Sequence, residues 1–127
     1  MVPDGWTPEA VAMAQGLLYV LTGLWPLVSM GTFLKVTGPK TDLWLVKTVG
    51  AVVLVVGAAL LLAGLRRSVS PEIALVAVGC AAALTAVDLA YVARRVIGPV
   101  YLLDAAAEAG LLVWWALVAA RGAGIAA

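Results

Sequence analysis

Histidine is absent from the 127-residue chain, and cysteine occurs once, at Cys80. Without histidine the chain cannot build a histidine-ligated haem or zinc site, or a nucleophile activated by histidine. With one cysteine it forms neither an internal disulfide nor a paired-thiol redox centre, which excludes a thiol-quinone oxidoreductase. We therefore expect no metal and no cofactor, and we interpret Cys80 as a small packing residue in an alanine-rich run.

Charge is scarce as well. Charged residues make up 12% of the chain, against roughly 25% in soluble domains, and the net charge is +1. This balance points neither to a nucleic-acid partner nor to a polybasic membrane anchor. Hydrophobic residues make up 65% of the chain, and the mean hydropathy is +1.11. A chain of this size cannot hide so much apolar surface in its own core, so we expect lipid to cover it.

Four apolar runs are each long enough to cross a bilayer as a helix. They cover roughly residues 8–30, 43–65, 71–95 and 101–120, and about 20 residues suffice at a rise of 1.5 Å per residue. The period-two alternation of barrel strands is missing, and the short connections favour antiparallel neighbours. The sequence predicts an all-α integral membrane protein, a single domain (1–127) built as a bundle of four antiparallel transmembrane helices.

Cap and turn residues mark the ends of these spans. Thr7 and Ser70 are each followed by Pro and Glu, the pattern of a capped helix start with an acidic first turn. Pro26 is predicted to kink or end the first helix. A polar connector with a Gly-Pro turn follows, residues 33–42. No Lys or Arg precedes the first run, so we interpret it as a retained span rather than a cleaved signal.

Gly50, Gly57 and Gly64 recur every seven residues on the second span. Small residues on one helix face let helices approach closely in lipid, where close packing drives association. We predict that these glycines form a packing seam. Such a seam could stabilise the bundle itself or join the chain to other membrane helices, for example those of a second copy in a homo-oligomer.

The ionisable residues gather toward one end of the predicted bundle. The side that carries the first and third connectors holds five of the eight Lys and Arg residues: Lys35, Lys40, Lys47, Arg94 and Arg95. The other side holds three. This excess favours a cytoplasmic position for these connectors, with both termini outside.

Several polar side chains fall within the spans. Asp88, Tyr91 and Arg95 share one face of the third span, and Asp104 and Glu108 lie one turn apart in the fourth. A charge in the membrane costs about 2.5–3.5 kcal/mol on insertion scales, so such groups pair or face a wet cavity. We predict a polar network, or a ligand-binding pocket, at one membrane face, formed by Lys47, Asp88, Tyr91, Arg95, Tyr101, Asp104 and Glu108.

A second interpretation of some of these residues stays open. Arg94, Arg95, Tyr101 and Asp104 are also typical of the membrane–water interface, where arginine extends to headgroups and tyrosine lies in an aromatic belt. Trp115 lies seven residues after Glu108, on the same helix face. It is predicted either to line an apolar ligand space or to belong to the core.

The layout combines a short first span with "GLLYVLTGLWPL", a polar connector, and a second span with "TVGAVVLVVGAALLLAG". In these features the whole chain resembles the DoxX-like group of small four-helix bacterial membrane proteins, although no exact motif is shared. The resemblance implies a four-helix bundle and identifies no functional residue.

Three functions are compatible with the sequence. Our main prediction is a multi-pass protein of the bacterial inner (cytoplasmic) membrane that binds an amphiphilic or lipid-like small molecule in a polar pocket, with membrane lipids as its surroundings. The second is a structural or assembly partner of other membrane helices. The third is a membrane enzyme that uses Asp88 or Glu108 as a general acid or base on a lipophilic substrate.

Overall fold

The structure, a computed structural model, describes residues 4–126, and the side chains of residues 5–121. This part of the chain is helical throughout apart from its connections. A short 3-10 helix, η1 (Asp4–Trp6), precedes five α-helices: α1 (Pro8–Val28), α2 (Met30–Thr37), α3 (Leu43–Leu65), α4 (Pro71–Ala93) and α5 (Tyr101–Ala126). The helices α1, α3, α4 and α5 are long and apolar enough to cross a membrane. The predicted all-α fold is confirmed, and the four long apolar helices indicate a multi-pass membrane protein.

The predicted caps of the first and third spans are present. The Thr7 hydroxyl accepts a hydrogen bond from the Ala10 N–H at 3.2 Å, and the Ser70 hydroxyl accepts one from the Ile73 N–H at 3.2 Å. The third span is two residues shorter than predicted. It ends at Ala93, and Arg95 follows with a left-handed φ of 61°, as at a helix end closed by a turn.

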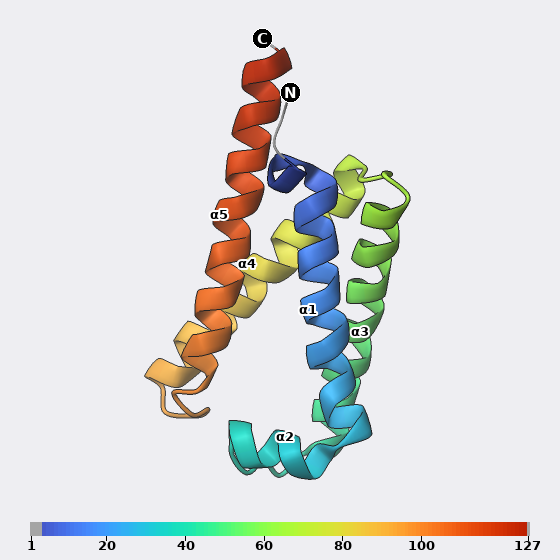
Figure 1. Cartoon of the computed structure of the whole chain (residues 1–127). Coiled ribbons are helices and arrows are strands. Elements are labelled where there is room, and N and C mark those ends of the chain that lie inside the picture. Colours follow the sequence, from blue (N-terminus) through green and yellow to red (C-terminus); the bar gives the residue numbers. More distant parts are fainter. Residues whose placement is uncertain (1–3, 127) are drawn as a thin grey trace.

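The predicted polar connector is partly helical. Ser29, with φ −145° and ψ 81°, separates α1 from α2. Three residues earlier, Pro26 remains inside α1, where it supplies no N–H to the preceding turn. The Trp25 indole donates a hydrogen bond to Thr32 at 3.0 Å and meets the Phe33 ring edge-on at 5.3 Å. These contacts fold α2 back across the end of the bundle (Figure 1).

The heptad glycines of α3 pack against α1 in the same chain. Gly50, Gly57 and Gly64 are buried, and two glycines of α1, also seven residues apart, lie opposite them: Gly16 beside Gly57 and Gly23 beside Gly50. A Cβ atom added to Gly57 would lie 2.8 Å from the Gly16 carbonyl oxygen, closer than real Cβ atoms approach. The order of these contacts makes α1 and α3 antiparallel.

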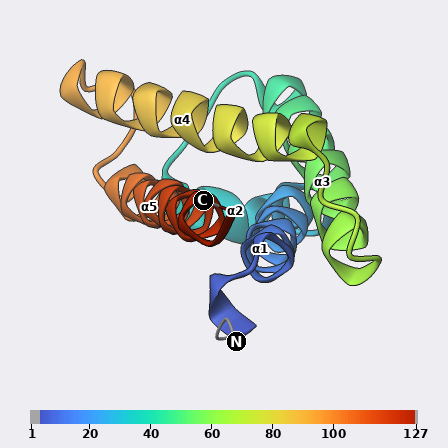
Figure 2. The same cartoon turned by 90° about the horizontal axis from the view of Figure 1, so that it is seen from above.

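The other two long helices form a second pair. α4 and α5 follow one another through a short turn and run in opposite directions (Figure 1). The view from above shows α4 running along one side of α5 and α1, with its first turns beside α3 (Figure 2). The two pairs meet around a core that includes Val11, Leu60, Ala77 and Leu111. Toward α2 the pairs diverge, and α2 lies across the opening.

Replacing Gly57 with leucine should lower the melting temperature of the detergent-solubilised protein by roughly 5–10 °C. The new side chain would overlap the α1 backbone at Gly16 and Val20. Gly110→Leu is the matched control, because the space beside Gly110 is open. Thermal unfolding followed by circular dichroism measures both. Equal melting temperatures for the two variants would contradict the close contact between α1 and α3.

Candidate functional site

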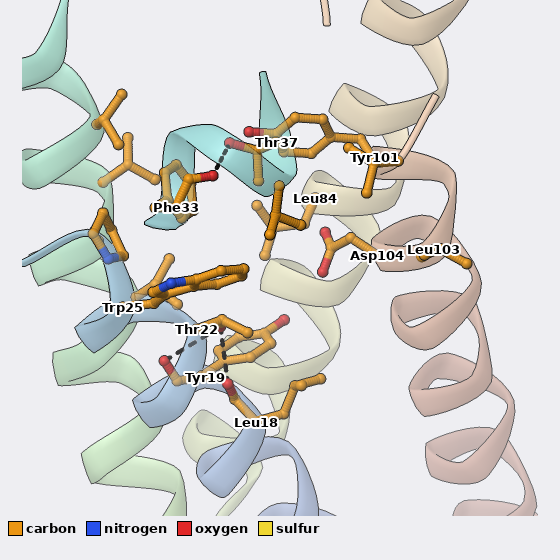
Figure 3. A pocket seen from close by; sticks show the side chains of 18 of the residues that line it. Leu18, Tyr19, Thr22, Trp25, Phe33, Thr37, Leu84, Tyr101, Leu103 and Asp104 are labelled. Carbon is orange, nitrogen blue, oxygen red and sulfur yellow. Dashed lines mark hydrogen bonds between the residues drawn. The ribbon is translucent and has the colours of Figure 1, made fainter. Parts of the chain in front are cut away.

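A cavity of about 590 Å³ lies between the two helix pairs, beside α2. All five α-helices contribute to its wall, and most of the lining side chains are apolar. Figure 3 shows Tyr19 and Trp25 of α1 on one side, Leu84 and Asp104 of the α4–α5 pair on the other, and Phe33 of α2 at one end. Small-molecule sites are commonly apolar cavities of about 300–1,000 Å³ with few polar groups. The volume and lining of this cavity fit that description.

Glu108 lines the cavity from the second turn of α5. Its side chain is 1% exposed, and the Tyr19 hydroxyl donates a hydrogen bond to its Oε2 at 2.7 Å. Tyr19 lies near the middle of α1, so this contact joins the first helix pair to the second. Hydrogen bonds to an ionised carboxylate are stronger than those between neutral groups, and both kinds are stronger where water is excluded.

Gln15 makes a second buried connection one turn before Tyr19. Its amide donates a hydrogen bond to the Ala77 carbonyl of α4 at 2.9 Å and accepts one from the Trp115 indole of α5 at 2.7 Å. Trp115 is 6% exposed and belongs to the core. Of the two predicted roles for Trp115, the structure favours the core position over a place in the cavity wall.

Sequence reasoning missed Gln15 and Tyr19 as site residues. The signal was present, because an amide and a phenol at positions i and i+4 lie on one face in the middle of an apolar span. The prediction started from the charged side chains of the later spans and added only the tyrosines near them in the sequence, so it left out Gln15 and Tyr19.

The end of the cavity nearest α2 combines Lys40 with aromatic rings. The Lys40 ammonium donates hydrogen bonds to the Thr37 hydroxyl at 2.9 Å and to the Gly38 carbonyl at 3.1 Å. It lies 5.3 Å from the centre of the Phe33 ring and 5.2 Å from that of Tyr101. These contacts hold a cation against the aromatic part of the cavity wall.

Asp88, on α4, is buried close to the cavity but is not among the residues that line it. Its side chain is 4% exposed, and its Oδ2 has no hydrogen-bond partner among the described residues. It is close enough to Asp104 and Glu108 to interact electrostatically with both. Three carboxyl groups therefore lie near one another where α4 and α5 are adjacent.

The seven predicted polar residues divide into two groups. Tyr101, Asp104 and Glu108 line the cavity, and Asp88 is buried close to it. Lys47 and Tyr91 are exposed and do not line the cavity. The Tyr91 ring contacts Arg94 instead, whose guanidinium carbon lies 5.8 Å from the ring centre. Arg95 is exposed and lines a separate space of about 520 Å³ at the α4–α5 turn. A long basic side chain near a helix end can extend to water, which accounts for the outward position of Lys47.

The described residues include no group of three or more Cys, Asp or Glu side chains placed to hold a metal ion. Comparison with family models, with curated proteins and with solved structures gave no significant match. The resemblance to the DoxX-like group stays a prediction, and the interpretation of the cavity depends on its own geometry.

Replacing Gln15 with leucine should destabilise the protein by about 1–3 kcal/mol, because groups on α4 and α5 would lose their partner without water to replace it. Thr48→Val is the control, since the exposed Thr48 hydroxyl bonds only to its own helix, at the Trp44 carbonyl. Reversible unfolding in mixed micelles measures both variants. If Gln15→Leu is as stable as Thr48→Val, Gln15 does not join the helix pairs.

Proposed function

We propose that the protein binds a small amphiphilic molecule inside the membrane, in the cavity between the two helix pairs. One observation supports this most strongly: a cavity of about 590 Å³ with mainly apolar walls is also lined by Glu108, Asp104 and Lys40. Apolar walls accept a hydrophobic body, and a few fixed polar groups orient a head group. A ligand with both parts satisfies this lining better than a purely apolar or purely polar molecule.

The polar groups indicate how such a ligand would lie. Glu108, held by Tyr19, is at the deeper end, and Asp104 lies one turn of α5 closer to α2. The apolar body would lie along side chains such as Leu18, Val53 and Leu84. Because α2 lies across the opening between the pairs (Figure 1), displacement of α2 would give access from the interface.

We also propose a location in the bacterial inner (cytoplasmic) membrane. The support is compositional: the apolar residues are mostly Ala, Val and Leu with a single Phe, and the layout resembles that of the DoxX-like bacterial proteins. In this membrane the lipid bilayer itself would supply or receive the bound molecule.

The enzyme alternative has weaker support. General acid–base chemistry requires groups that reach the substrate. Glu108 lines the cavity, but Asp88 is not among the residues that line it.

The assembly alternative is favoured by one observation on α4. The glycine seam of α3 is already covered by α1, so a second copy would need another surface. On α4, Gly79 and its neighbours Ala82 and Ala83 are exposed, and nothing lies within 4 Å of a Cβ built at Gly79. A small-residue surface of this kind permits close contact between helices in lipid.

Native mass spectrometry of the gently purified protein, followed by extraction of what is retained, tests the binding proposal. The wild-type protein should retain one defined amphiphile. Leu84→Trp should lose it, because the larger ring would fill the cavity that Leu84 lines. Leu75→Trp should retain it, because Leu75 lies on the same helix with 72% of its surface exposed, outside the cavity lining.

Retention of bulk phospholipid alone, unchanged in Leu84→Trp, would contradict the binding proposal. A dimer mass together with that result would favour the assembly alternative.

A further inference from the structure

We infer that the ligand is a monovalent organic cation, an amphiphile with an amine or quaternary ammonium head that is bound by Glu108 and Asp104 beside the aromatic wall of the cavity. This inference rests on the proposed binding function and names the chemical class of its ligand.

The balance of charge around the cavity comes first. Counted as ionised, Asp104 and Glu108 contribute two negative charges to the lining, and Lys40 contributes one positive charge. With these three groups ionised, the remainder is one negative charge. A single positive charge on the ligand would neutralise the lining, whereas an anionic head group would be repelled.

The cations of the chain do not compensate these carboxyl groups. The Lys40 ammonium is directed to Thr37 and Gly38 rather than to a carboxylate. Lys47, Arg94 and Arg95 are exposed and do not line the cavity. Among the described residues, Tyr19 is the one hydrogen-bond partner of Glu108, and Asp88 Oδ2 has none. Because uncompensated carboxylates are costly in a membrane, a bound cation would stabilise this arrangement.

Aromatic rings supply the second element of a cation site. Trp25, Phe33 and Tyr101 line the same cavity as the two carboxyl groups. Ring faces attract ammonium groups, and rings arranged around a cavity are a known way to bind quaternary ammonium. The Lys40 ammonium, 5.3 Å and 5.2 Å from the centres of Phe33 and Tyr101, already makes such contacts with these two rings, so Trp25 is the ring of the three that is left to a ligand cation. The walls are therefore suited to a cation with an apolar body.

Two probe ions of the same shape and opposite charge test the inference: tetraphenylphosphonium and tetraphenylborate. Their binding to the full chain in phosphatidylcholine nanodiscs is measured by equilibrium dialysis, with protein-free nanodiscs as the blank. We expect saturable binding of the phosphonium ion and none of the borate. Asp104→Asn and Glu108→Gln should each weaken phosphonium binding by about tenfold or more, a loss typical of one charged contact.

Glu72→Gln is the matched control, because Glu72 is an exposed carboxylate at the start of α4, away from the cavity, and should leave binding unchanged. If Glu108→Gln does not fold, Asp104→Asn decides the result, since Asp104 is half-buried and makes no hydrogen bond to Tyr19.

Equal binding of both ions, preference for the borate, or phosphonium binding unaffected by Asp104→Asn would overturn the cation inference. So would the absence of saturable phosphonium binding. The proposed function would survive any of these results if the amphiphile found by mass spectrometry is still lost in Leu84→Trp. The proposed function itself would be contradicted if Leu84→Trp retains the same amphiphile as the wild-type protein.

Discussion

The hydrogen bond between Tyr19 and Glu108 is the interaction on which the rest of the structure depends. It joins α1, which belongs to one helix pair, to α5, which belongs to the other. Both side chains are at most 1% exposed. Water cannot replace it there, and a carboxyl group without a partner would be costly. The bond therefore fixes how far apart the pairs can lie, and it places Glu108 at the end of the cavity.

Two faces of α1 determine how the other long helices pack around it. Its glycine face, Gly16 and Gly23, brings its backbone against α3, so close that no side chain fits between. Its polar face, Gln15 and Tyr19, holds α4 and α5 through side chains. One contact is tight and the other is spaced by side chains. The pairs consequently diverge toward α2, and the space between them becomes a cavity rather than packed core.

The sequence predicted the four spans because their length and hydropathy are local properties. It also predicted the caps at Thr7 and Ser70, since capping depends on neighbouring residues. The spacing of Gly57 and its heptad neighbours indicated a close contact, but spacing on one helix does not name the partner. The glycines of α1 identify α1 as that partner only when the two helices are placed together. The predicted polar network grouped Lys47 with Glu108 because charge was the criterion, whereas the cavity depends on which side of each helix faces inward. That is set by tertiary packing, as is the return of α2.

A double-mutant cycle on Tyr19→Phe and Glu108→Gln, with unfolding measured in mixed micelles, tests the central claim most directly. If the two side chains bond across the helix pairs, the effects of the single changes should fail to add by about 1–2 kcal/mol. Tyr91→Phe combined with Glu108→Gln is the matched control, because Tyr91 is exposed and should give additive effects. Additive effects for Tyr19 and Glu108 as well would contradict the account.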